Sequence, residues 1–301
     1  MPTSYHTRVC PVCAQERFEQ FLTKGNLSLV KCVNCSMVYV NPVVSEMATG
    51  TFYDQTGLEY LSKEKVESDY SDTRFTRELR LFRKHCPHGS VLDVGCSSGG
   101  FLHALTKRYP GDYEVLGTDI SSAPLEYAKK MGIPVVKGDF LNHVFEKRFD
   151  AVTFWAVMEH LMEPRLFLEK TASILSPSGL CIILVPNLRS LAVRLLGAKY
   201  RYILPEHINY FTSKTLEAFV KRDFNIVSIS STHFNPIVIL KDFRNRKQEV
   251  SREERFQLLR KTSGYKRSPW LFPVKLAYET VEFGLGKLSL ADNLVILCRK
   301  K

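Results

Sequence analysis

An acid and a glycine-rich turn stand where a short apolar segment gives way to a helical pattern. The run 91–94 contains Asp93, and glycines at positions 95, 99 and 100 follow it directly. A buried strand, a tight loop and a helix start in this order place backbone N–H groups against a ligand. Because glycine has no Cβ, the loop can pass close beneath that ligand. The segment therefore predicts a binding loop.

Two more acids end the next predicted strands, and together the three acids indicate the ligand. Asp119 closes the segment 114–119 and Asp139 closes the segment 134–139. An acid at the second strand end can accept both hydroxyls of a ribose, and Asp139 can accept from an adenine amino group while Phe140 covers the ring. Either aspartate could instead cap a helix. A dinucleotide is disfavoured, because Ser97 replaces the second glycine of G-x-G-x-x-G and Asp93 would face a pyrophosphate.

The stretch Asp93–Gly99 resembles the first motif of class I S-adenosylmethionine-dependent methyltransferases, which usually have glycine at the position of Ser97. The resemblance implies a cofactor with an ammonium and a sulfonium, which suits Asp93. It also implies a doubly wound, seven-stranded, Rossmann-like α/β sheet. The cofactor-binding residues expected on this basis are Asp93, Gly95, Cys96, Gly99, Asp119, Ile120, Asp139, Phe140 and Trp155.

Two C-x2-C pairs near the N-terminus predict a metal site. Cys10 and Cys13 form one pair, Cys32 and Cys35 form the other, and eighteen residues separate the pairs. This spacing is typical of a four-thiolate zinc site, and four protein ligands leave no open position, so the zinc is expected to be structural. A redox pair or plain buried thiols are the alternatives. The succession from the cysteines through Tyr53 resembles bacterial methyltransferases of sugar and cell-surface pathways that carry an N-terminal zinc ribbon.

Two pairs of Glu and His are the candidates for catalysis. Glu159 and His160 follow the fourth predicted strand, 149–155. Their loop resembles that of ubiquinone-pathway O-methyltransferases, in which an E-x-x-E-H pattern is linked to a divalent metal. Ala156 occupies the position of the first glutamate in this pattern, which argues against a catalytic metal. We therefore expect Glu159 and His160 to orient the loop or to line the pocket.

Glu206 and His207 lie in an insertion after the fifth strand, where ligands bind in open α/β sheets. The ordinary pKa of histidine suits a general base. The E-H-x-x-Y-F stretch resembles sugar C-methyltransferases, but Leu204 replaces their upstream tyrosine, which leaves the accepting atom open. The alternative is that His207 caps the helix starting near Ser213 or packs structurally.

The elements that must position these residues divide the chain into three predicted parts. Residues 1–44 form the zinc-ribbon module, residues 45–88 a helical lid and connector, and residues 89–301 the cofactor-binding domain. In the connector, Arg74 or Arg77 of a helix over 72–85 either reaches the cofactor carboxylate or stays exposed. The last domain is expected to end with a sixth strand and an antiparallel edge strand, 293–299. Between them, a basic insertion at about 236–290 contains an amphipathic helix, 270–285.

Composition narrows the classes of function. The chain has 301 residues, 45% of them hydrophobic, and a net charge of +11. It contains no apolar run of the ~18 residues that a membrane span needs, and no apolar leader, so a cytoplasmic location is expected. In a reducing setting, the other cysteines (Cys86, Cys96, Cys181 and Cys298) are expected in the core or in loops.

The positive charge is concentrated at 241–275, where eleven Lys or Arg stand against four Asp or Glu. This excess fits a solvated helical face, or contact with anionic substrates, phosphate or a membrane surface.

The sequence thus predicts methyl transfer from S-adenosylmethionine to a small-molecule acceptor, such as a sugar, a nucleotide sugar or a lipid-linked metabolite. An RNA methyltransferase is the first alternative, since zinc ribbons and positive charge also suit RNA. The nearly balanced charge of the ribbon argues against it. A non-catalytic protein that binds the cofactor is the second alternative.

Overall fold

The computed structural model describes residues 4–244 and 272–301, and its centre is a seven-stranded sheet. The strand order is β12-β13-β10-β9-β6-β7-β8, with β13 antiparallel to both of its neighbours. This is the predicted Rossmann-like α/β sheet. Its strands are β6 (Gly89–Val94), β7 (Tyr113–Asp119), β8 (Val135–Lys137), β9 (Phe149–Trp155), β10 (Leu175–Pro186), β12 (Phe224–Thr232) and β13 (Asn293–Lys300).

Side chains of the central strands alternate between two apolar clusters, one on each face of the sheet. In β10, Cys181, Ile183 and Val185 belong to one cluster, and Leu180 and Ile182 belong to the other. This period of two is a property of extended backbone, and near-continuous apolar strands require cover on both faces.

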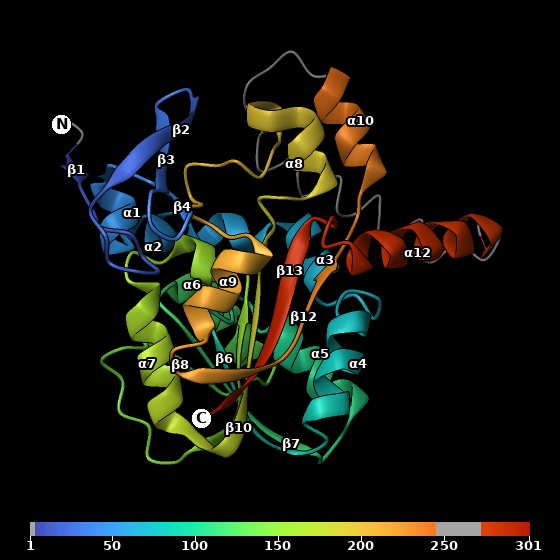
Figure 1. The fold of residues 1–301 in the computed structure, drawn as a ribbon. Coiled ribbons are helices and arrows are strands. Elements are labelled where there is room, and N and C mark those ends of the chain that lie inside the picture. The colour runs from blue at the N-terminus through green and yellow to red at the C-terminus, as the bar shows by residue number, and fades with distance from the viewer. Residues whose placement is uncertain (1–3, 245–271) are drawn as a thin grey trace.

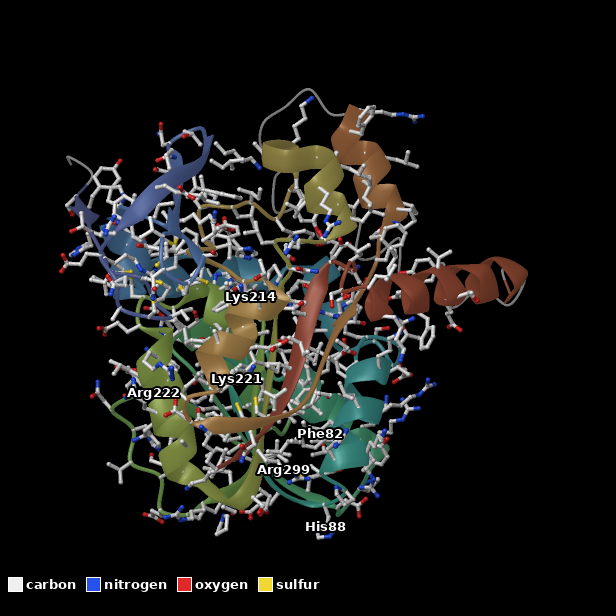
Figure 2. The ribbon with its side chains drawn as sticks, in the orientation of Figure 1. Phe82, His88, Lys214, Lys221, Arg222 and Arg299 are labelled. Atoms are coloured by element: carbon white, nitrogen blue, oxygen red, sulfur yellow. The ribbon has the colours of Figure 1, made fainter. Side chains whose placement is uncertain are left out.

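Helices supply that cover on both faces (Figure 1). One face is covered by α7 (Pro164–Ile174) and α9 (Ser213–Val220). The other is covered by α4 (Thr76–His85), α5 (Gly100–Arg108) and α6 (Ser122–Lys130). Figure 2 labels Phe82 of α4, which packs edge-on against Phe101 of α5 with the ring centroids 5.8 Å apart.

The last strand of the chain is not an edge strand, which corrects the sequence-based prediction. Strand β13 lies between β10 and β12, and Ile296 pairs with Ile183 on one side and with Ile229 on the other. All residues from Leu294 to Cys298 are buried. An apolar strand of this kind is stable only between two neighbours, whereas β12, with Val227 exposed, suits the edge.

The N-terminal module shares its sheet with the insertion after β10. A four-stranded sheet has the order β11-β4-β3-β2, in which β11 (Asn209–Tyr210) comes from that insertion. Cys10 and Cys32 belong to the same apolar cluster as Val152 of the central sheet. The predicted division at residue 44 stays a prediction, and the two parts share one core. The module's own strands are β1 (Tyr5–His6), β2 (Phe18–Lys24), β3 (Leu27–Cys32), β4 (Val38–Val40) and β5 (Val43–Val44).

Short helices cover the end of the sheet at which the parallel strands stop. Figure 2 labels His88, directly before β6, at the opposite end. The lid segment, residues 45–72, contains the expected helices: α1 (Ser45–Thr49), α2 (Thr51–Gln55), η1 (Gly57–Leu61) and α3 (Lys63–Asp69). The insertions add η2 (Met158–His160), α8 (Leu191–Leu196), η3 (Gly197–Lys199), α10 (Pro236–Arg244) and α12 (Phe272–Lys287).

Most of the basic segment 241–275, and Trp270 of the predicted helix, lie outside the described residues. Among the described helices, none is both long and apolar enough to cross a membrane.

Candidate functional site

The loop between β6 and α5 has the backbone of a ligand-binding turn. Gly95 and Gly99 have φ angles of +72° and +79°, a region that side chains disfavour. A Cβ on Gly95 would also lie 2.6 Å from Cγ2 of Val157. Ser97 adopts a φ of +50° as well, which explains why glycine suits this position in related loops. The N-terminus of α5 follows, so unpaired N–H groups point at the same place.

Two of the predicted cofactor acids meet beside this loop. Asp93 is buried and accepts a hydrogen bond of 2.7 Å from the Thr153 hydroxyl. Burial raises the pKa of Asp93 to about 7, and the charge of nearby Asp119 adds to the rise. The carboxylate oxygens of Asp119 accept 2.9 Å hydrogen bonds from the N–H groups of Ser97 and Ser121. Burial raises the pKa of Asp119 too. Such a pair is suited to a cationic ligand.

The third predicted cofactor acid, Asp139, has a different environment from the one expected. Asp139 is exposed and accepts hydrogen bonds from the N–H of Leu141, at 2.9 Å, and from Nδ2 of Asn142, at 2.8 Å. These bonds lie within a turn, and no helix directly follows Asp139, so they are not the helix cap that the sequence left as the alternative. The expectation that Phe140 covers an adenine is wrong for this structure, because its ring is 3% exposed and stacks on Phe167 in the core.

The remaining predicted cofactor residues differ in how their side chains lie. Ile120 is 39% exposed next to Asp119. Trp155 packs on Phe101 with the ring centroids 4.8 Å apart. The thiol of Cys96 is buried against Gly117, where an added Cβ would lie 2.6 Å from the sulfur. Cys96 can therefore contribute its backbone to the loop, whereas its side chain faces the sheet.

The lid segment contacts the glycine loop directly. The Tyr70 hydroxyl donates to the carbonyl of Ser98, and the Ser98 hydroxyl donates to Asp69 at 3.3 Å. Arg77 pairs with Glu282 of α12, and Arg74 lies 3.9 Å from Asp69. Both arginines thus pair with protein carboxylates in this structure.

The predicted catalytic residues come together beside the loop as a glutamate–histidine cluster of Glu159, His160 and His207. Their donor atoms all lie within 4.8 Å of one another. Glu159 is 1% exposed, and neither carboxylate oxygen has a hydrogen-bond partner among the described residues. Burial raises the pKa of Glu159 to about 8, so the carboxyl is protonated at neutral pH. A cluster with such donors can relay a proton or accept a cation.

Main-chain carbonyls set the orientation of both imidazoles. Nδ1 of His207 lies 3.0 Å from the carbonyl of Tyr202, and Nδ1 of His160 lies 2.7 Å from the carbonyl of Glu206. Because a carbonyl only accepts, each Nδ1 carries the proton in the neutral ring and the lone pair is on Nε2. Glu206, predicted as a catalytic residue, is buried, and its main-chain carbonyl orients His160.

Two residues of the site were not predicted from the sequence. The hydroxyl of Tyr53, in α2 of the lid segment, lies 2.9 Å from Nδ1 of His160 and 3.3 Å from the carbonyl of Glu206. Asn209 donates from Nδ2 to the carbonyls of Met158 and Leu161, at 2.8 and 2.7 Å. Asn209 therefore fixes the turn that carries Glu159 and His160. In the sequence, the only feature that could have indicated Asn209 is its position two residues after His207.

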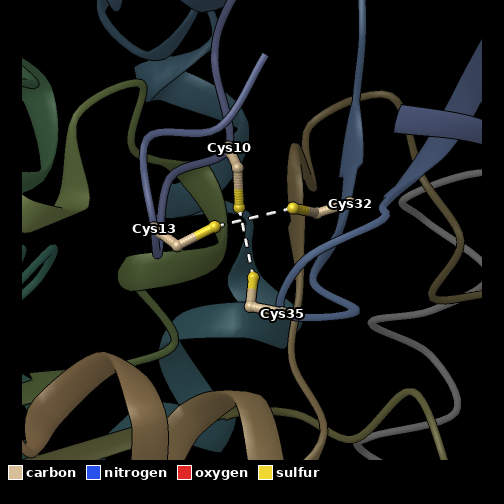
Figure 3. Close-up of side chains that lie close together, drawn as sticks. All are labelled: Cys10, Cys13, Cys32 and Cys35. Atoms are coloured by element: carbon tan, nitrogen blue, oxygen red, sulfur yellow. Dashed lines mark hydrogen bonds between the residues drawn. The ribbon is translucent and has the colours of Figure 1, made fainter. Parts of the chain in front are cut away.

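The four N-terminal cysteines form a second cluster, the cysteine cluster (Cys10, Cys13, Cys32 and Cys35). Figure 3 shows their sulfurs pointing toward one common centre. The sulfurs of Cys10 and Cys35 are 3.4 Å apart, and those of Cys13 and Cys32 are 3.5 Å apart. Zn–S bonds of ~2.3 Å in a tetrahedron separate the sulfurs by about 3.8 Å, and all eight cysteines of the chain are free thiols. The geometry fits a four-thiolate zinc ion.

Comparisons with known proteins agree with this arrangement. The profile of a family described as a methyltransferase domain matches residues 67–229, more than half of the chain. The ubiquinone biosynthesis O-methyltransferase of Proteus mirabilis (strain HI4320) is 34% identical over 122 residues, which are 38% of this chain and 49% of that enzyme. The chain thus spans about half the length of this relative, and 51% of the enzyme of the same name from Histophilus somni (strain 2336).

Solved structures share the fold. A SAM-dependent methyltransferase from Thermotoga maritima aligns with a TM-score of 0.54 at 16% identity, covering 83% of this chain and 99% of that one. The N-methyltransferase NodS from Bradyrhizobium japonicum WM9, solved with S-adenosyl-L-homocysteine, aligns with a TM-score of 0.50 at 13% identity, covering 82% of this chain and 97% of that one. Identities this low concern the fold alone.

Proposed function

This chain belongs to the methyltransferase-domain family, and we propose that it transfers a methyl group from S-adenosylmethionine to a small-molecule acceptor. The observation that carries the proposal is a juxtaposition at one end of the sheet. There, the buried Asp93 and the partly buried Asp119 flank a positive-φ glycine loop, and the glutamate–histidine cluster lies next to it.

Three carboxylates would bind the cofactor. Asp93 would face the ammonium of the methionine part, and Asp119 would accept from the ribose hydroxyls while it keeps its hydrogen bonds to Ser97 and Ser121. A cation beside Asp93 would lower the raised pKa of that carboxyl, which is a favourable coupling. Asp139 retains an exposed carboxylate that could accept from the adenine amino group.

The glutamate–histidine cluster would serve the acceptor. When bound, S-adenosylmethionine would supply the methyl group to an acceptor hydroxyl oxygen and would leave as the neutral thioether. Nε2 of His207 would take the proton of that hydroxyl. Positioning of donor and acceptor can contribute up to about 7–11 kcal/mol to such a displacement. A general base adds ~10²–10⁴-fold. The protonated carboxyl of Glu159 can donate a hydrogen bond that orients the acceptor.

For the acceptor we propose a hydroxylated sugar, nucleotide sugar or lipid-linked metabolite. The matched relatives are named as O-methyltransferases, which supports oxygen as the accepting atom, and a hydroxyl is the acceptor that needs a base. For the cysteine cluster we propose a structural zinc ion, because four thiolates close the coordination sphere.

Isothermal titration of the purified protein with S-adenosylmethionine, and separately with S-adenosylhomocysteine, tests the proposal. We expect micromolar binding of both, abolished in Asp119→Ala. Radiolabelled methyl transfer to panels of hydroxylated sugars, nucleotide sugars and lipid-linked metabolites would then identify the acceptor. If the folded, zinc-loaded protein binds neither cofactor form, the proposal is wrong.

A further inference from the structure

Helices α8 and α10 lie side by side at the end of the molecule that also carries the N-terminal module (Figure 1). Their outward positions are apolar: Leu195 of α8 is 59% exposed, and Leu240 and Phe243 of α10 are 57% and 71% exposed. We call this surface, formed by residues 188–204 and 235–244, the α8–α10 face. Large exposed apolar side chains on two helices that contact each other indicate an interaction surface.

The two segments that carry these apolar side chains also carry an excess of positive charge. Among residues 188–204 and 235–244, Asp242 is the single carboxylate. It is buried and pairs with Arg201, whose Nε lies 2.9 Å from Oδ1 of Asp242. The five remaining cations are exposed, and none forms an ion pair with a described carboxylate. They are Arg189, Arg194, Lys199, Lys241 and Arg244.

The orientation of α10 is fixed, so its apolar residues cannot turn inward. Val238 and Asp242 are four positions apart and therefore lie on one side of the helix. Val238 packs into the apolar cluster that contains Leu196, and Asp242 is held by Arg201. With that side anchored, Leu240 and Phe243 must point away from the protein.

We propose that the α8–α10 face docks the protein on an anionic phospholipid surface. The exposed apolar side chains match the acyl boundary of a membrane, and the exposed cations of the same two segments match acidic headgroups. A nucleic acid would pair with the cations but would leave Leu195 and Leu240 without an apolar partner. The chemistry of the face therefore favours lipid.

The location of the face gives docking a functional consequence. The insertion after β10 carries both α8 and His207, and Nδ1 of His207 bonds to the carbonyl of Tyr202, next to Arg201. Docking would place the candidate acceptor site close to the headgroup layer, where a lipid-linked substrate resides. Membrane docking itself does not rest on the proposed function, because binding is measured without cofactor or acceptor.

Co-sedimentation of the full chain with vesicles tests the inference. We expect binding to vesicles of phosphatidylcholine with phosphatidylglycerol, weak binding to phosphatidylcholine alone, and a decrease as salt is raised. Lys241→Gln with Arg244→Gln should weaken binding by about 30-fold, at ~1 kcal/mol per cation. Leu240→Glu with Phe243→Glu should reduce it at least as much.

A matched variant on another helix distinguishes binding through the α8–α10 face from non-specific hydrophobic adsorption. Phe283 of α12 is 68% exposed, almost as much as Phe243, so Phe283→Glu should leave vesicle binding unchanged. Thermal unfolding of all variants checks that they are folded. The inference is wrong if the wild-type protein does not bind anionic vesicles, or if it binds RNA but not vesicles. It is also wrong if Phe283→Glu weakens vesicle binding as much as the α10 variants do.

Discussion

Within the described part of the chain, two clusters bring donor atoms close enough for a metal ion, and they are built in opposite ways. The cysteine cluster comes from two short segments within residues 10–35, joined by one hairpin of β2 and β3. The glutamate–histidine cluster draws Glu159 and His160 from η2 and His207 from the insertion after β10. One is local in sequence, and the other exists only when distant segments pack.

The chemistry of the clusters differs in the same way. Four soft thiolates satisfy zinc completely and leave no reactive position. The glutamate–histidine cluster mixes a protonated carboxyl with two imidazoles and lies beside the glycine loop. A metal site with a complete set of protein ligands is suited to stabilising the fold. A site of mixed donors whose hydrogen bonds are not all made is suited to catalysis. The clusters should therefore fail differently when mutated.

The largest effect is expected in the cysteine cluster. Cys32→Ser should give insoluble or aggregating protein, because structural zinc contributes ~10–16 kcal/mol of apparent binding energy in small zinc domains, and Cys32 is part of the central core. Soluble yield and zinc content by mass spectrometry are the measurements. Cys86→Ser, at a buried thiol outside the cluster, should keep its zinc. A well-folded, zinc-free Cys32→Ser protein would refute the structural role.

His207→Ala should damage the reaction and spare the fold. Loss of a general base is expected to lower kcat by ~10²–10⁴-fold. The dissociation constant for S-adenosylmethionine should remain nearly unchanged, because His207 comes from the insertion after β10, whereas the proposed cofactor acids Asp93 and Asp119 belong to β6 and β7. Steady-state kinetics and calorimetry measure the two quantities. If cofactor affinity collapses together with turnover, His207 is structural and its assignment as base fails.

The cofactor acids beside the glutamate–histidine cluster should make binding depend on pH. With a pKa of about 7 for Asp93, the free protein is mostly neutral at this carboxyl at pH 6, and binding a cation must first release the proton. Affinity for S-adenosylmethionine should therefore rise roughly tenfold from pH 6 to pH 7.5. Calorimetry across this range measures it. Asp93→Asn should bind more weakly with a flat profile, and an equally steep rise in that variant would exclude Asp93.

The smallest effect tests whether the lid segment orients the glutamate–histidine cluster. Tyr53→Phe removes the hydroxyl 2.9 Å from Nδ1 of His160 and keeps the ring. Loss of the hydrogen bond that orients His160, about 0.5–1.5 kcal/mol, should lower kcat by two- to tenfold. Zinc content should match the wild type, and the melting temperature should fall by no more than about 2–4 °C. A shift in melting temperature with unchanged kcat would mean that Tyr53 only anchors the lid segment.

The glycine loop, the positions of its first two acids and the clustering of the four cysteines were predictable because each depends on short-range rules. An acid at the end of an apolar strand must lie at the edge where the other parallel strands end. Two C-x2-C knuckles need only one hairpin to meet. The alternation of β10 likewise follows from the period of two in extended backbone.

Packing between distant segments decided the rest. Tyr53 meets His160 across 107 positions of sequence, and no local pattern encodes such a contact. The burial of Phe140 against Phe167 and the place of β13 inside the sheet depended on which neighbours were available to cover apolar surface. The sequence by itself thus determined which groups the chain carries and at which strand ends they stand. Tertiary structure alone decided which of them face one another, because burial and hydrogen bonding are satisfied over the whole fold.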